Sequence, residues 1–249
     1  DVLFLAEAFT KPPMLQTLGA IGFHQSYTYF TWRTEKGEVE DYLREVSEES
    51  AHRIRPNFFV NTPDILHEFL QYGGPAAFKI RAVLAATGSP SWGVYSGYEL
   101  FEHVAVRPGS EEYLDSEKYQ LRPRDWDAAE TEGRTLAPYL TRLNELRRTH
   151  PALQLLRNLT VHPTDSDHLI CFSKRAADDV VIVVLNLDPH AAHEGTVHVD
   201  LAALGLPAGA SFAVHEELTE EDWTWSEHAW VRLDPAVQPA HVLTVRSMP

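Results

Sequence analysis

Cysteine is almost absent from this sequence, with Cys171 the single example among 249 residues. No disulfide can form within the chain, and such a composition suits a reducing compartment. Apolar runs long enough to span a bilayer are also absent, and the opening residues predict a strand rather than a cleavable signal peptide. We therefore expect a soluble, cytoplasmic protein.

Positive charge is scarce as well. The 21 Lys and Arg residues face 36 Asp and Glu residues, which gives a formal net charge of −15. Such a chain repels phosphate backbones and anionic membranes, so neither nucleic acid nor membrane is expected as a partner. A small anionic substrate would need a local cationic contact.

Several functional motifs are missing. The chain has neither G-x-G-x-x-G nor G-x-x-x-x-G-K-[ST], so nucleotide binding lacks a motif, and it has no G-x-S-x-G nucleophile elbow. The 13 His residues form no H-E-x-x-H pattern and no Cys pair exists, so no zinc site is predicted.

The first 150 residues alternate strand and helix patterns. Apolar runs predict strands at Val2–Phe9, Phe23–Phe30, Asn57–Val60 and Trp92–Tyr95. Helical spacing or helix-end signals predict helices from Pro12, around residues 39–46, from about residue 80 to Gly88, and from Leu136 to Pro151. This alternation predicts a parallel sheet with helical crossovers, in which the Val2–Leu5 run is covered on both faces.

The pattern changes after Pro151, where short strands follow one another. We predict strands at His168–Ser173, Val180–Leu187, Thr196–Leu201, Ser211–His215, Trp230–Leu233 and His241–Arg246. These strands indicate an antiparallel β-sandwich, with a domain boundary near residue 151 between residues 1–150 and 151–249. The acidic cluster Glu216–Glu221 is predicted to be a solvated loop.

Glu7 interrupts the otherwise apolar run VLFLAEAF. An unpaired buried charge costs several kcal/mol, so a carboxylate in such a run needs a reason. It stands near the carboxyl end of its strand, where parallel barrels carry catalytic groups, and desolvation there would favour a general acid. The alternative is a structural Glu paired with an Arg.

Asp64 ends a second apolar run, NFFVNTPD. Two carboxylates at the ends of nearby parallel strands suit glycosyl chemistry. The alternative is that Asp64 caps the N-terminus of a following helix over Ile65–Tyr72.

Two further stretches carry weaker signals. The aromatic side chains of Trp92, Tyr95 and Tyr98 could stack on sugar rings, although such residues are more often core. Lys118 could bind an anion, although a lone loop lysine is usually solvated.

Taken in order, these segments resemble strands five to eight of the α-amylase superfamily of glycoside-active (β/α)₈ barrels. FLAEAF resembles the strand-five motif with the acid/base Glu, FFVNTPD the strand-seven motif with the transition-state-stabilising Asp, and SPSWGVYSGYE the strand-eight segment. LTRLNELRRTHPAL resembles the last barrel helix before the C-terminal sandwich. The resemblance implies an α/β fold: the C-terminal half of a (β/α)₈ TIM-type barrel, followed by an antiparallel β-sandwich.

Pro63 departs from that family, because most members have His at this position. AEAFTKP, FVNTPDILHEFLQYGG and EKYQLRPRDW instead resemble one subgroup, the maltosyltransferases that use α-maltose 1-phosphate to extend α-1,4-glucans. That resemblance implies Glu7 as general acid/base, Asp64 as transition-state stabiliser, and Lys118 and Tyr119 as contacts to the maltosyl unit.

The subgroup implies further properties. It implies transfer with retention and release of phosphate, a homodimer, and no metal or organic cofactor. The family nucleophile is an Asp at the end of strand four, so an N-terminal part of the enzyme is expected to supply it, and this chain alone is expected to lack it. Two alternatives stay open: another amylase-family enzyme, such as a trehalose synthase or α-glucan hydrolase, or a non-catalytic carbohydrate-binding half.

Overall fold

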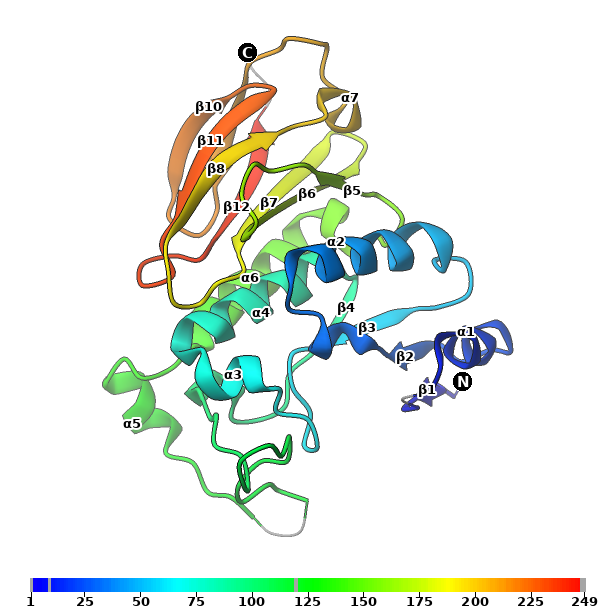
Figure 1. Cartoon of the computed structure of the whole chain (residues 1–249), viewed down its shortest axis with the longest axis vertical. Coiled ribbons are helices and arrows are strands. Elements are labelled where there is room, and N and C mark those ends of the chain that lie inside the picture. Colours follow the sequence, from blue (N-terminus) through cyan, green and yellow to red (C-terminus); the bar gives the residue numbers. More distant parts are fainter. Residues whose placement is uncertain (1, 9, 119–120, 247–249) are drawn as a thin grey trace.

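The computed structural model describes residues 2–8, 10–118 and 121–246. Its first part contains a four-stranded parallel sheet in the order β1-β2-β3-β4 (Figure 1). The strands are β1 (Leu5–Ala6), β2 (Gln25–Tyr27), β3 (Pro56–Phe59) and β4 (Ser91–Gly93). All three pairings are parallel, so the predicted parallel sheet is confirmed, although its strands are shorter than the apolar runs suggested.

Helices connect these strands and cover the sheet. They are α1 (Pro12–Ala20), α2 (Lys36–Arg44, continued by a π-helical turn over Glu45–Glu49), α3 (Glu68–Tyr72), α4 (Gly74–Gly88), α5 (Trp126–Thr131) and α6 (Ala137–Thr149). Short 3₁₀ turns occur at Tyr29–Trp32, Tyr98–Leu100 and Pro151–Gln154. Figure 1 shows α2, α4 and α6 between the parallel sheet and the C-terminal strands.

The C-terminal part is antiparallel, as predicted. A six-stranded sheet has the order β10-β9-β12-β7-β6-β5, and β8 pairs with β11 in a second sheet. The strands are β5 (Leu159–His162), β6 (Leu169–Ala176), β7 (Asp179–Asn186), β8 (His193–His198), β9 (Phe212–Glu216), β10 (Glu221–Trp225), β11 (His228–Leu233) and β12 (Ala240–Arg246), with the short helix α7 (Leu201–Leu204) after β8. The change of strand type falls near residue 151, and a domain boundary there stays a prediction.

Two hydrophobic clusters fill the interior. One lies within the C-terminal part, between the six-stranded sheet and the β8–β11 pair. The other is continuous from Phe30 and Phe58, through helix α4, to Phe172 and Val183 in the C-terminal sheet. The two parts of the chain are therefore held together by one shared core.

The expectation that Val2–Leu5 would be covered on both faces is wrong for this structure. Val2, Leu3, Phe4 and Leu5 are more than half exposed. The physical reason is that β1 stands at the end of the sheet and pairs only with β2 among the described residues.

The prediction of a solvated loop over Glu216–Glu221 holds for the turn of residues 217–220, but it is wrong for the two ends of the segment. Glu216 is the last residue of β9 and is fully buried, and Glu221 begins strand β10. The Glu216 carboxylate accepts hydrogen bonds from the backbone N–H groups of Leu218 and Val242, at 3.0 and 2.9 Å, and of Thr219. Burial raises the pKa of Glu216, and these donors act in the opposite direction.

None of the helices in the described residues combines the length and the apolar character needed to cross a membrane.

Lys174 in β6 generates a prediction about stability. Its side chain is fully buried, and Nζ donates to the Leu155 carbonyl oxygen at 2.6 Å. Burial, assisted by the charge of Arg147, lowers the pKa of Lys174 to about 7. Between pH 7 and the ordinary lysine pKa near 10.4, the unfolded chain holds a proton that the folded protein has released, so stability rises with pH in that window.

We expect Lys174→Met to stabilise the protein most near pH 6.5 and to remove this rise toward pH 9. Urea unfolding at the two pH values measures both effects. Lys11→Met, at an exposed site, is the control and should leave the pH profile of the parent unchanged. A rise of the same size in Lys174→Met would contradict the assignment.

Candidate active site

The carboxyl ends of the four parallel strands meet at one edge of the sheet. The pairings Leu5↔Gln25, Tyr27↔Asn57 and Phe59↔Gly93 fix the register along the sheet. Glu7 follows β1 at this edge, and the turn that carries Asp64 follows β3. Since neighbouring strands lie about 4.8 Å apart, strands β1 and β3 are separated by roughly 10 Å.

Glu7 lies beside Tyr27 at the end of β2. Burial, and secondarily the negative charge of Glu7, raise the pKa of Tyr27. The Tyr27 ring in turn packs edge-on against Phe59 at a centroid distance of 4.4 Å. The Tyr27–Phe59 contact therefore links the end of β2 to the end of β3, and Glu7 is near enough for its charge to act on Tyr27.

Glu7 itself is exposed, so the expected desolvation of this carboxylate is wrong for this structure. The cause is the position of β1 at the end of the sheet. Within residues 2–8, 10–118 and 121–246, Glu7 forms no ion pair, so the alternative of a structural Glu–Arg pair gains no support.

Asp64 is not a helix cap. It lies in a turn closed by the Thr62–Ile65 bridge, and helix α3 begins four residues later. The capping group of α3 is His67, whose Nδ1 accepts from the Phe69 N–H at 3.2 Å. Local capping therefore does not explain a carboxylate at this position.

Lys118 reaches back to Asp64 across 54 residues of sequence. Its ammonium group forms an ion pair with the half-exposed Asp64 carboxylate and a second one with Glu112 at 3.1 Å. Hydrogen bonds to Asp64, and then to Glu112, raise the pKa of Lys118. The structure thus brings two of the predicted site residues together, while Tyr119 lies outside the described residues.

Asn61 is a buried polar residue at this edge that sequence reasoning did not single out. Its Nδ2 donates to the Tyr113 hydroxyl at 2.6 Å, and its Oδ1 accepts from the Tyr95 N–H at 2.8 Å. Asn61 therefore ties the end of β3 to the loop after β4. Its position three residues before Asp64, in the same run NFFVNTPD, could have identified it as a residue of this edge.

The loop after β4 is anchored a second time by Arg124. This guanidinium forms a two-bond pair with Glu102 at 2.8 and 3.0 Å, and an ion pair with Glu117 at 3.0 Å. The bonds to Glu102, opposed by burial, raise the pKa of Arg124. Glu117 immediately precedes Lys118, so this network positions the lysine that meets Asp64.

The three aromatic residues of the loop have different environments. Tyr98 is fully buried and its hydroxyl donates to the Phe78 carbonyl at 2.5 Å, so it is a core residue. Tyr95 is half-buried, and its hydroxyl accepts from the Glu117 N–H at 3.0 Å. Trp92 is half-buried and lines a surface cavity with Asn144, to which its Nε1 donates at 3.3 Å.

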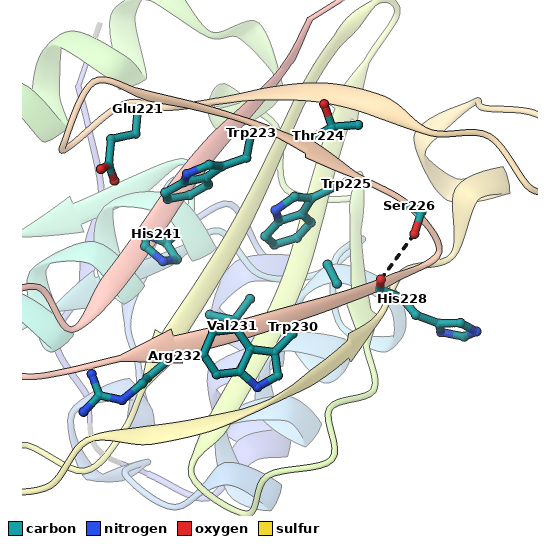
Figure 2. Close-up of a pocket in the computed structure, with 11 residues that line it drawn as sticks. Glu221, Trp223, Thr224, Trp225, Ser226, His228, Trp230, Val231, Arg232 and His241 are labelled. Carbon is teal, nitrogen blue, oxygen red and sulfur yellow. Dashed lines mark hydrogen bonds between the residues drawn. The ribbon is translucent and has the colours of Figure 1, made fainter.

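A separate cavity of about 550 Å³ lies on the C-terminal part, between β10 and β11 (Figure 2). Three indole rings line it: Trp225 is 7% exposed, Trp230 is 63% exposed, and Trp223 packs edge-on against His241 at 4.9 Å. We call this cavity the tryptophan groove. The alternation in EDWTW, which puts two indoles on one strand face, was the signal that sequence reasoning missed.

Comparisons with known proteins place these features in context. The profile of a family described as "GLGE, C-terminal" matches residues 161–245. The chain is 61% identical over 246 residues to alpha-1,4-glucan:maltose-1-phosphate maltosyltransferase 2 of Streptomyces coelicolor. This alignment covers 99% of the chain and 37% of the relative. The maltosyltransferase of Mycobacterium tuberculosis H37Rv is 52% identical, over 100% of the chain and 36% of the relative. The chain thus spans little more than a third of these relatives.

Solved structures show the same fold at low sequence identity. The α-amylase of Geobacillus thermoleovorans, complexed with acarbose, superposes with a TM-score of 0.70 at 14% identity, over 99% of this chain and 54% of that one. The α-amylase of H. orenii superposes with a TM-score of 0.69 at 11% identity, over 99% of this chain and 54% of that one. At these identities the likeness concerns the fold alone.

The Asn61 network generates a prediction. Asn61→Ala would leave the Tyr95 N–H and the Tyr113 hydroxyl without their partner, and we expect a loss of about 1–3 kcal/mol in the free energy of unfolding. Urea unfolding measures it. Asn144→Ala, at a half-buried site, is the control and should cost less than about 1 kcal/mol. Equal losses in the two variants would contradict a special role for Asn61.

Proposed function

The chain is related along its whole length to the C-terminal part of the α-1,4-glucan:maltose-1-phosphate maltosyltransferases, and from this premise we propose that its parent enzyme extends α-1,4-glucans. The enzyme would move a maltosyl unit from α-maltose 1-phosphate to the non-reducing end of the glucan, with retention and release of phosphate. The observation that supports the proposal is that Glu7 follows β1, and the Asp64–Lys118 ion pair follows β3, at the same edge of one parallel sheet.

The parallel sheet would be the C-terminal half of a (β/α)₈ barrel, and residues 151–249 a C-terminal β-sandwich domain packed against it through the shared core. Two observations support the half-barrel. Both outer strands, β1 and β4, have one unpaired edge among the described residues, and the apolar side chains of Val2–Leu5 are exposed beside β1. Further strands would pair with such edges and cover such side chains.

Retention requires two displacements. A carboxylate nucleophile, supplied by an N-terminal part of the enzyme, would attack the anomeric carbon and release phosphate, while Glu7 protonates the leaving oxygen. Glu7 would then remove the proton from the acceptor 4-hydroxyl as that oxygen displaces the nucleophile.

Asp64 would bind ring hydroxyls of the reacting sugar, through bonds that strengthen as positive charge develops on the ring. The Lys118 ammonium group pairs with this carboxylate before substrate arrives. When the maltosyl unit enters, its hydroxyl groups would take over hydrogen bonds that Asp64 and Lys118 otherwise make to each other. Tyr119 would contact the same unit. The enzyme would act as a cytoplasmic homodimer in glucan synthesis, and the transfer reaction would use no metal or organic cofactor.

We expect Glu7→Gln in the complete enzyme to lower kcat by about 10²–10⁴-fold, the usual contribution of a general acid/base. Asp64→Asn should lower it by about 10²–10³-fold. Phosphate release from maltose 1-phosphate in the presence of glycogen measures both. Glu112→Gln is the matched control, because it removes the other carboxylate on Lys118 and should change kcat by less than about fivefold.

These outcomes separate the alternatives. A trehalose synthase or α-glucan hydrolase would lengthen no glucan and release no phosphate from this donor. Full turnover in Glu7→Gln would remove Glu7 from the mechanism. A complete enzyme that binds glycogen without turning over the donor would favour the non-catalytic, carbohydrate-binding function.

The tryptophan groove supports carbohydrate binding as a second function of this chain. Indole faces stack on the apolar faces of pyranose rings, and the cavity adds Glu221, Arg232 and His241 as polar partners for hydroxyl groups (Figure 2). His241 is held neutral near pH 7, because burial lowers its pKa to about 4. A neutral imidazole is a suitable hydrogen-bond partner for an uncharged sugar.

We expect the double variant Trp223→Ala/Trp230→Ala to bind glycogen about tenfold more weakly than the parent, because each lost stacking contact contributes about 0.5–1.5 kcal/mol. Affinity electrophoresis in glycogen gels measures the binding. Val237→Ala, at an exposed site outside the groove, is the control. Unchanged glycogen retention in the double variant would exclude the groove as a glucan site.

A further inference from the structure

Three potential metal ligands meet at one end of the β-sandwich. His168 immediately precedes β6, Asp188 follows β7, and His193 begins β8. One ligand atom from each lies within 4.8 Å of the other two. The spacings of 20 and five residues match no zinc motif, so the fold alone assembles this His168–Asp188–His193 cluster.

The cluster is partly organised already. His193 Nε2 lies 2.9 Å from Asp188 Oδ2, and the other Asp188 oxygen accepts the backbone N–H of His190 at 2.8 Å. The imidazole rings of His168 and His193 lie against each other with centroids 3.9 Å apart. Among the described residues no hydrogen bond engages the His168 ring, so its nitrogens are available to a ligand.

Hydrogen bonds tie together the backbone beneath the cluster. Leu187 N–H donates to the His168 carbonyl at 2.9 Å, which locks the start of β6 to the end of β7. Buried Asn186 donates to the Ala191 and Leu233 carbonyls at 2.8 and 3.1 Å, which shapes the loop between β7 and β8. The three ligand residues are thus carried by fixed strand ends, and only their side chains need to rotate.

We propose that this cluster binds a divalent transition-metal cation of the Zn²⁺ type. Two imidazoles and one carboxylate form a donor set that suits such ions, whereas Mg²⁺ and Ca²⁺ prefer oxygen ligands alone. Tetrahedral ligands at bond lengths of about 2.1 Å lie about 3.4 Å apart, so binding requires side-chain rotations that close this spacing and turn the two stacked rings until both face the ion. Water would complete the coordination.

The bound cation would connect the start of β6, the end of β7 and the start of β8, and so would hold the loop of residues 188–193 in place. Pro189 in that loop lies close to Gly73, between helices α3 and α4: a Cβ atom added to Gly73 would be 3.1 Å from Pro189 Cγ. The cation would therefore stabilise the junction between the sandwich and helices α3 and α4. It takes no part in the proposed glycosyl transfer.

The full-length enzyme, freed of metal with a chelator, provides the test. Zn²⁺ titration by calorimetry, and Co²⁺ titration by visible absorption, should reveal a saturable site that raises Tm. His168→Ala and His193→Ala should each bind at least tenfold more weakly at this site and lose the rise in Tm.

His190→Ala is the matched control, since His190 lies in the same loop but outside the cluster. It should keep the site and the Zn²⁺-dependent rise in Tm. Unchanged stoichiometry, affinity and Tm response in His168→Ala would overturn the proposal, and so would an equal loss in His190→Ala. Because His168 is exposed, its variant is expected to fold, and circular dichroism of the metal-free protein checks this. Glycosyl transfer activity does not enter the readout, so failure of the proposed function would leave the result interpretable.

Discussion

Helix α4 must be buried on every side, and the arrangement of the chain follows from this constraint. From Ala77 to Gly88 nearly every residue is buried, so the helix has no solvent face to offer. A helix that is apolar all round needs partners in every direction. Strands β3 and β4 pack against it from one part of the chain and strands β7 and β12 from the other, with helix α6 alongside.

The same helix carries one charge into the core. Arg81 is buried, and its guanidinium donates to the carbonyl oxygens of Phe30 and Arg33 at 2.6 and 2.7 Å while lying 4.0 Å above the Phe30 ring. Burial lowers the pKa of Arg81 to about 10, so the group is still cationic at neutral pH. It satisfies carbonyls of the 3₁₀ turn after β2, which connects the packing of α4 to the edge where the site residues lie.

Sequence patterns predicted what depends on periodicity and apolar content: the parallel sheet, helices α1, α2, α4 and α6, and the antiparallel C-terminal strands. They failed where the environment of a residue is set by partners far away in the sequence. Glu216 looks like part of a solvated acidic loop, yet three backbone N–H groups, one of them from β12, make its burial possible. Asp64 has the local signature of a helix cap, and only the folded chain brings Lys118 to it. The His168–Asp188–His193 cluster has no local signature at all.

The two proposed catalytic carboxylates are held very differently. Asp64 lies in the turn between β3 and α3, and β3 packs against α4. Its ion pair with Lys118 joins it to the loop after β4, which Asn61 and Arg124 anchor. Glu7 follows a two-residue strand with one strand neighbour and an exposed surface. Preorganisation lowers a barrier only when each reacting group is fixed. Since the shared core reaches β3 and β4 but not β1, the packing of this chain fixes Asp64 more firmly than Glu7.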